Sequence, residues 1–205
     1  MEVLKKIIVI VFIISSYGLK GQTTEEIIAA FKSSYTQEYN GKYSDAVNTI
    51  KKVYVASSYP INLRLGWLSY LAGQYSDAVS YYSKAIKIRP LSIEARLGMT
   101  YPASAMGNWD NVITQYKEIL KIDPNNYTAN LKLGQIYYGR KNYTAAEKYF
   151  DVVINNYPFT YDGVIGAAWN YLKMGKLREA KVLFEYALML NPGDESATAG
   201  MKAIK

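Results

Sequence analysis

Apolar residues recur at spacings of three and four along most of the chain, which is the period of an amphipathic α-helix. In residues 127–160, one such run ends at a turn from Gly139 to Asn142, and a second run ends before Pro158. Proline lacks the amide donor that a helix interior needs, so it marks the end of the second run. The pattern therefore predicts a pair of helices joined by a short turn.

This helical hairpin repeats with a period of 34 residues. Three columns of residues keep that step: prolines at Pro90, Pro124, Pro158 and Pro192; small or branched residues at Ala78, Val112, Ala146 and Ala180; and rings at Tyr82, Tyr116, Phe150 and Phe184. A further column begins with rings at Tyr75, Trp109 and Tyr143 and changes to Leu177. One hairpin cannot bury its apolar face alone, so the units are expected to stack into a solenoid.

The repeat also sets the expected domain organisation. The segment 41–47 returns almost unchanged as 73–79, 32 residues later, so the first unit is shorter than the others. The predicted units are 27–58, 59–92, 93–126, 127–160 and 161–194. Residues 195–205 read as one capping helix with Asp194 at its start. The expected fold is all-α: a right-handed solenoid of about five antiparallel helix-turn-helix repeats and a C-terminal cap.

The unit 127–160 resembles the tetratricopeptide repeat (TPR) family in its small, aromatic and proline positions. Residues that carry the resemblance are Gly134, Tyr137, Tyr143, Ala146, Phe150 and Pro158. The resemblance extends over residues 27–194. Pro102 departs from it, and we expect this proline to kink the first helix of its unit or delay its start. Thr100 and Val112 replace the usual small residues there, so this unit is expected to pack most loosely.

The resemblance implies that the first helix of each pair lines a concave groove that holds a peptide or protein partner. The positions carried over to this chain are Phe31, Tyr35, Tyr39, Leu63, Trp67, Tyr70, Leu97, Tyr101, Leu131, Gln135, Tyr138, Ile165, Trp169 and Leu172. Aromatic anchors in a concave surface are typical of tight protein contacts. The alternative is that these rings belong to the core, or that residues 22–26 or a second copy cover them.

The composition gives no support for catalysis. The chain has 205 residues, 50% of them hydrophobic, with 21 Tyr but no His and no Cys. This excludes imidazole bases, thiolate nucleophiles and Cys/His metal sites. Asp45, Asp77 and Asp110 recur near the starts of second helices, where a carboxylate favours the helix dipole. We therefore expect no enzyme, no cofactor and no metal.

The N-terminus has the features of a secretory signal peptide over residues 1–21. Lys5 and Lys6 precede an apolar run at 7–14, and small residues follow. That run is too short for a spanning helix, which needs about 20 residues. Cleavage after Gly18 fits the small-residue rule better than cleavage after Gly21. The protein is thus expected in a periplasm or cell envelope, anchored to the membrane if the signal stays uncleaved.

The net charge of +7 comes from Lys and Arg spread along the chain, which argues against a nucleic-acid partner. The signal and the Tyr-, Asn-, Lys- and Ile-rich composition resemble those of small exported repeat proteins of Bacteroidota. The expected function is an exported scaffold that binds a peptide or protein, in envelope assembly or secretion. Two alternatives remain open: a self-assembling structural subunit, which would form a homo-oligomer, and a glycan-binding envelope protein.

Overall fold

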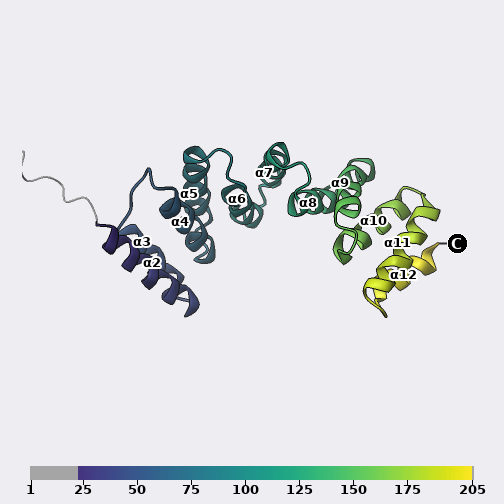
Figure 1. Ribbon diagram of the computed structural model, residues 1–205, viewed down its shortest axis with the longest axis horizontal. Coiled ribbons are helices and arrows are strands. Elements are labelled where there is room, and N and C mark those ends of the chain that lie inside the picture. The colour runs from purple at the N-terminus through teal and green to yellow at the C-terminus, as the bar shows by residue number, and fades with distance from the viewer. Residues whose placement is uncertain (1–22, 205) are drawn as a thin grey trace, which may run out of the picture. The chain divides into compact units, whose positions relative to one another are not determined.

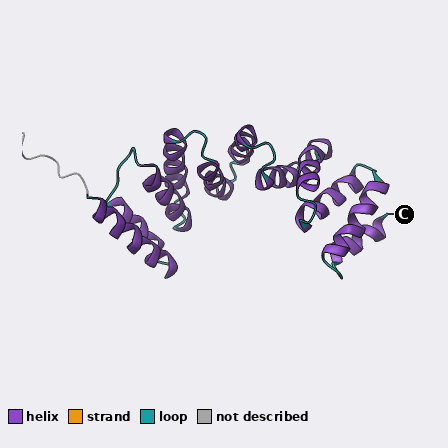
Figure 2. Ribbon diagram, in the orientation of Figure 1, coloured by secondary structure: helices purple, strands orange, loops and turns teal. Residues whose placement is uncertain are grey.

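The computed structural model describes residues 23–204, and the predicted signal segment lies outside them. The described residues form eleven helices joined by turns and loops, with no strand among them (Figure 2). The prediction of an all-α fold is confirmed. The chain divides into two compact units, one ending at Val55 (unit 1) and one beginning at Ala56 (unit 2).

Unit 1 is one helical pair, α2 (Thr24–Tyr39) and α3 (Tyr43–Lys51). Helix α2 begins before residue 27 because Thr23 and Glu26 form a reciprocal capping box. The Glu26 amide donates to the Thr23 hydroxyl at 3.2 Å, and the Thr23 amide donates to the Glu26 carboxylate at 2.9 Å. Two amides at the helix start are thereby satisfied. Residues 24–26 are consequently part of α2 rather than a separate lead-in segment.

Unit 2 contains four helical pairs and a final single helix, which follow one another in chain order (Figure 1). The first helices of the pairs are α4 (Tyr59–Leu71), α6 (Ile93–Ala105), α8 (Tyr127–Gly139) and α10 (Tyr161–Lys173). The second helices are α5 (Tyr75–Ile88), α7 (Trp109–Ile122), α9 (Tyr143–Asn156) and α11 (Leu177–Leu190). The first helices and α12 (Glu195–Ala203) begin 34 residues apart, as the sequence period requires.

A buried ring in the second helix of each pair forms the centre of the packing. Tyr82, Tyr116, Phe150 and Phe184 occupy this position, and all four are buried. The Tyr82 ring lies against Gly66 of its own pair and Gly98 of the next, where a Cβ would come within 2.9 Å and 2.2 Å of it. Glycine at these two points lets three helices close around one ring.

The Tyr116 ring, in the repeat 93–126, lacks these two glycine neighbours. Thr100 stands where Gly66 and Gly134 stand in the neighbouring repeats, and Lys132 stands where Gly98 and Gly166 stand. The Tyr116 hydroxyl donates to the Thr100 hydroxyl at 3.4 Å. Helix α6 packs less extensively on α7 than the other first helices of unit 2 pack on their partners, and the packing of α7 on α8 is thinner still. Within unit 2, this repeat therefore has the least extensive helix packing, in the direction that was expected.

Pro102 lies within α6 and is buried. The helix begins at Ile93, in register with the first helices of the other pairs, and continues past the proline to Ala105. A delayed start, one of the two expected effects of Pro102, was therefore wrong. Pro102 comes after about two and a half turns of a helix that the Ser92 cap has already started, so its missing amide affects only the last turn.

Helix α12 caps unit 2 by packing against α10 and α11. The Ala197 amide donates to the Asp194 carboxylate at 2.6 Å, which starts the helix as expected. Ala197 is buried beside Phe184, and Met201 and Ile204 pack on the same cluster. The short helix thus covers apolar surface that a fifth repeat in unit 2 would otherwise cover.

Candidate functional site

The first helices of unit 2 contribute to two neighbouring cavities. The first cavity measures about 450 Å³ and lies among α4, α6, α7 and α8. The second measures about 610 Å³ and lies among α8, α9, α10 and α12. Gln135 of α8 lines both, so the two cavities flank this helix. Their volumes fall in the range of binding sites for small molecules and peptide side chains.

An aromatic cluster forms one wall of the first cavity. The Tyr70 ring lies 5.5 Å from the Tyr101 ring, 5.7 Å from Trp67 and 6.0 Å from Tyr75, measured between centroids. Tyr101 also meets Trp67 edge to face at 6.0 Å, and half of the Tyr101 surface is exposed. Rings at these distances support one another, which presents Tyr101 to solvent at little cost in side-chain freedom.

The other walls of the first cavity follow from the loose packing of its repeat. Thr100, Tyr116 and Lys132 line it, and they occupy the positions where ring-against-glycine contacts close the neighbouring repeats. Trp109 adds an exposed ring from the start of α7. Side chains larger than glycine hold α6, α7 and α8 apart, and the space between them remains as the cavity.

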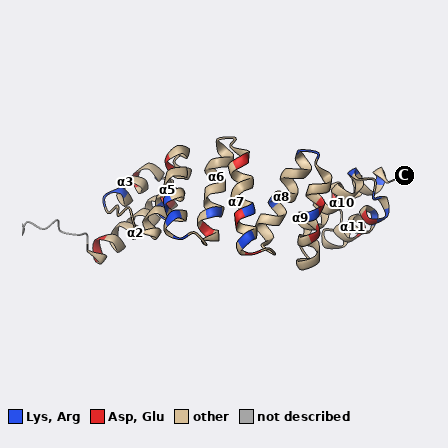
Figure 3. Ribbon diagram, turned by 90° about the horizontal axis from the view of Figure 1, so that it is seen from above, with Lys and Arg blue, Asp and Glu red and all other residues tan. Residues whose placement is uncertain are grey.

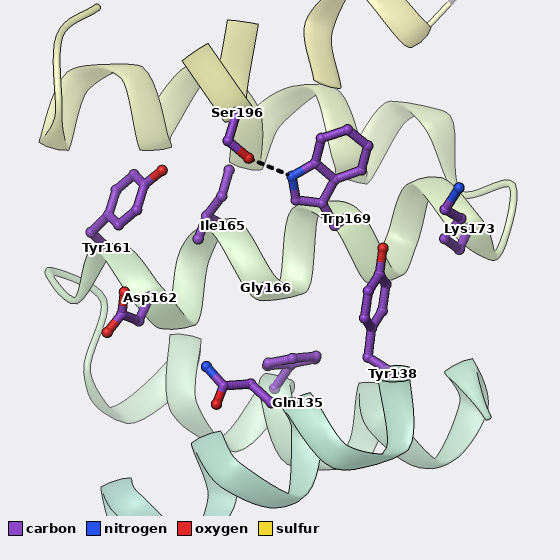
Figure 4. A pocket seen from close by; sticks show the side chains of 10 residues that line it. Gln135, Tyr138, Tyr161, Asp162, Ile165, Gly166, Trp169, Lys173 and Ser196 are labelled. Atoms are coloured by element: carbon purple, nitrogen blue, oxygen red, sulfur yellow. Dashed lines mark hydrogen bonds between the residues drawn. The ribbon is translucent and has the colours of Figure 1, made fainter. Parts of the chain in front are cut away.

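The second cavity combines apolar walls with charges near both ends of α10. Figure 4 shows Tyr138 of α8 facing Ile165 and Trp169 of α10, with Gly166 between the two α10 side chains. Asp162 lies in the first turn of α10 and Lys173 is its last residue; both are exposed. A ligand in this cavity would therefore meet apolar side chains in the middle and opposite charges toward the two ends.

Trp169 is held in place by two contacts. Its indole nitrogen donates to the Ser196 hydroxyl of α12 at 2.9 Å, drawn as a dashed line in Figure 4. Its ring meets Phe184 edge to face at 5.2 Å. Because one edge of the indole packs on the core and another lines the cavity, this side chain is both structural and accessible.

The tyrosine hydroxyls of the site are suited to hydrogen bonding rather than to acid–base chemistry. Burial raises the pKa of Tyr138, with a further contribution from Tyr143. Burial and a hydrogen bond to Asp194 raise the pKa of Tyr161 to about 12. These phenols stay neutral near pH 7 and can donate and accept. Among the described residues, no group of three His, Cys, Asp or Glu is placed to hold a metal ion.

Six of the residues predicted for the groove line the cavities: Tyr70, Tyr101, Gln135, Tyr138, Ile165 and Trp169. Trp67 is half-buried in the aromatic cluster beside them. Leu63, Leu97 and Leu172 are half-buried and pack on core clusters. Leu131 is buried with Phe150, so its placement in the groove was wrong: it faces the core, one position from the exposed Lys132.

The three remaining predicted residues belong to α2 of unit 1. Phe31 is half-buried, and its ring lies 6.5 Å from that of Tyr35. Tyr35 and Tyr39 are exposed, Tyr39 almost completely. These rings form an aromatic surface on their own unit, and their participation in a groove stays a prediction.

Several lining residues were missed at the sequence level. Trp109 comes from a second helix, and Tyr161 and Ser196 lie at the starts of α10 and α12. The ring column of Tyr75, Trp109 and Tyr143 contained the signal for the first of these, because each of its members begins a second helix next to the first-helix face. Tyr143, for example, lies 5.6 Å from Tyr138.

Taken together, the stacked helical pairs and the aromatic cavities on them define an α-helical repeat scaffold. Two tetratricopeptide repeat family models match the chain, at residues 27–93 and at 103–161, which together make up more than half of it. The chain belongs to the tetratricopeptide repeat family.

Known relatives and structures agree with this assignment. TPR repeat-containing protein YpiA of Bacillus subtilis is 26% identical over 168 residues, which make up 80% of this chain but only 40% of YpiA. Solved structures with the same fold include a tetratricopeptide repeat protein from Parabacteroides merdae, with a TM-score of 0.75, 19% identity and coverage of 88% of this chain and 72% of that one. MamA has a TM-score of 0.71 at 19% identity, with coverage of 82% and 93%.

A further structure of the same fold is YrrB, described as a TPR protein with an unusual peptide-binding site. Its TM-score is 0.69 at 14% identity, and the match covers 87% of this chain and 94% of YrrB. At such low identities, these three structural likenesses concern the fold alone.

Proposed function

We propose that this protein is an exported scaffold that binds a peptide or protein segment across the two cavities of unit 2. The observation that carries the proposal is the pair of aromatic-walled cavities on either side of Gln135. A chain segment laid over α8 would place one side chain in each cavity. The preformed walls would limit the ordering cost of binding.

The charges of the site favour a partner with both polar and apolar groups. Lys132 lines the first cavity, and Asp162 and Lys173 line the second. Lys and Arg are interspersed with Asp and Glu along the helices of unit 2, without a continuous basic stripe (Figure 3). This distribution supports recognition of a peptide in preference to a nucleic-acid backbone.

Export and a role in the cell envelope rest on the sequence of residues 1–21. A basic start followed by a short apolar run is the pattern of a cleaved signal. None of the described helices is long and apolar enough to cross a membrane. The test is the N-terminal residue of the protein recovered from the envelope fraction of expressing bacteria. A start at Leu19 or Gln22 supports export, whereas intact residues 1–21 in a cytoplasmic fraction contradict it.

Peptide binding can be tested with a displayed library of random peptides. Peptides selected on the protein are synthesised and titrated by fluorescence anisotropy against the parent and against Tyr101→Ala. Loss of one exposed aromatic anchor is expected to weaken binding at least tenfold, since such anchors contribute about 2 kcal/mol or more. The matched control is Leu91→Ala, an exposed apolar side chain that lines neither cavity.

The same titration with Trp169→Phe examines the second cavity. This change keeps the apolar ring but removes the donor to Ser196. All variants are first matched to the parent in helicity by circular dichroism. Equal affinity of the selected peptides for parent and Tyr101→Ala would contradict binding at the first cavity.

A further inference from the structure

The outward face of α11 differs from the same face of the other second helices in unit 2. Val182 is 58% exposed and Met189 is 74% exposed. The repeat places Ser80, Thr114 and Lys148 at the position of Val182, and Lys87, Lys121 and Asn155 at the position of Met189. All six of these counterparts are exposed and polar. The last repeat alone presents apolar side chains to solvent at these two positions.

The two apolar residues are part of a continuous patch. Tyr186 lies between Val182 and Met189 on the helix surface, at spacings of four and three residues. The Phe159 ring, 81% exposed, meets the Tyr186 ring at 6.4 Å. We call these four residues, Phe159, Val182, Tyr186 and Met189, the α11 patch. Contiguous exposed apolar surface of this kind marks an interaction site more often than single exposed residues do.

A cleft adjoins one end of the patch. It measures about 360 Å³ and opens beside the N-terminal half of α11, with Ile154, Tyr171 and Leu183 among its lining residues. Val182 stands at its edge. The protruding Met189 lies seven residues further along, about 10 Å toward the C-terminal end of the helix. One helix therefore carries a cleft near one end and a projecting side chain near the other.

We propose that two copies of this protein pair through the α11 patch, with their α11 helices antiparallel about a twofold axis. In this arrangement Val182 of one copy lies opposite Met189 of the second copy, and each Met189 enters the cleft of the other copy. The same contact then forms twice. Such self-complementarity is what a closed dimer with one kind of interface requires.

Charged side chains flank the patch on α11. Arg178 and Lys181 lie in the first half of the helix and Glu185 lies near its middle, where Lys181 Nζ and Glu185 Oε1 form an ion pair at 3.9 Å. In the proposed register the two Glu185 side chains lie near the twofold axis, with Arg178 and Lys181 of each copy on either side of them. Glu179, also in the first half, lines the cleft and would face the thioether of the incoming Met189. Parallel pairing would align like charges.

The first test measures mass as a function of concentration. The protein is followed by sedimentation velocity from about 1 µM to about 200 µM, the range in which a small interface populates a dimer. We expect the weight-average mass to rise toward twice the chain mass. The variant Val182→Lys/Met189→Asn gives α11 the residues that α9 has at the same two positions. It should remain at the mass of one chain with unchanged helicity. The control Thr114→Lys adds the same charge at the same repeat position of α7 and should dimerise like the parent.

The second test determines the register. The chain has no cysteine, so single substitutions allow specific cross-linking. Val182→Cys and Met189→Cys are oxidised separately and as a mixture, and a cross-linked dimer is expected mainly in the mixture. A chain that stays at single-chain mass at every concentration overturns the proposal and leaves the patch to a different protein. A dimer that survives Val182→Lys/Met189→Asn, or that cross-links equally without mixing, overturns the proposed interface.

Discussion

Single residues decide how closely the helices of unit 2 approach one another. The Tyr82 ring fits between two glycines, and the same arrangement recurs where Phe150 lies against Gly134 and Gly166. Of these four glycines, Gly98 has the least space, because a Cβ there would come within 2.2 Å of the Tyr82 ring. Close packing of this kind leaves no room for even one methyl group.

The change Gly98→Ala is therefore expected to destabilise the protein, by about 1–3 kcal/mol, because the added methyl group forces the Tyr82 ring or α6 to move. The matched control is Gly139→Ala at the end of α8, where a Cβ would meet nothing within 4 Å. That control should be neutral or stabilising by up to about 1 kcal/mol, since alanine restricts the unfolded chain. Urea denaturation followed by circular dichroism gives both free energies of unfolding. If the two changes altered the free energy of unfolding equally, the Tyr82 ring would have moved aside without strain.

The sequence predicted the rings at these positions better than it predicted the exposed site. Tyr82, Tyr116, Phe150 and Phe184 keep the 34-residue step, so their burial follows from the repeat alone. The first cavity depends instead on Thr100 and Lys132 replacing glycines in adjacent repeats. The sequence identified Thr100 as a departure from the repeat pattern, but it did not predict the cavity. A cavity depends on which positions face one another across three helices.

At the scale of elements, a contact between a tyrosine hydroxyl and an N-cap residue recurs at the starts of helices. The Tyr59 hydroxyl lies 2.7 Å from the hydroxyl of Ser92. Ser92 is the N-cap of α6, the first helix of the following pair. Tyr161 occupies the same position in α10 and hydrogen-bonds to Asp194, the cap of α12. In these two helices, the hydroxyl on the first residue thus supports the cap of the corresponding helix one repeat later. Ile93 of α6 lacks this hydroxyl, which is consistent with the thinner packing of α7 on α8.

The Asp194 cap makes the docking of α12 sensitive to acid. The amide of Ala197 and the hydroxyl of Tyr161 donate to the Asp194 carboxylate and hold its pKa below the ordinary value. A lowered folded-state pKa means that the carboxylate stabilises the fold above its unfolded pKa of about 3.9. This stabilisation is lost as the pH falls through the folded-state pKa.

Acidification from about pH 6 to about pH 3 should consequently lower the melting temperature of the parent more than that of Asp194→Asn, which keeps a capping oxygen but does not titrate. Thermal unfolding followed by far-ultraviolet circular dichroism gives the comparison. Glu195→Gln removes the neighbouring carboxylate and serves as the control; its acid dependence should stay close to that of the parent. If Asp194→Asn and the parent have the same pH dependence, the cap is not the titrating group.

For the whole molecule, the sequence period predicted the order and type of the helices because each repeat uses the same few contacts. The ends of α5, α7, α9 and α11 follow from the proline column, because each of these helices ends two residues before its proline. The division into two units was not predicted, since the repeat 27–58 has the same motif as its neighbours and differs mainly by two missing residues. The two residues are missing between the start of α3 and the start of α4, and α3 is shorter still, with nine residues where α5 has 14.

This division predicts where the folded chain is first cut by a protease. Lys51 and Lys52 are exposed at the end of α3, directly before the segment that joins the units. Within unit 2, the repeat interfaces oppose local opening, and the competing site is the loosely packed α6–α8 region. Brief digestion with trypsin should therefore cut first after Lys51 or Lys52 and release unit 2 as a stable fragment, identified by mass spectrometry.

The isolated fragment 53–205 should then keep the helicity per residue of unit 2, because its pairs bury their own core clusters and α12 closes the far end. In the control variant Lys51→Gln/Lys52→Gln, the early cut should disappear while later cuts keep their rates. First cleavage inside α6–α8 would mean that the packing around Tyr116, rather than the segment that joins the units, is the least stable point of the fold. The first cavity would then open by local unfolding, and peptide binding there should slow proteolysis in proportion to occupancy.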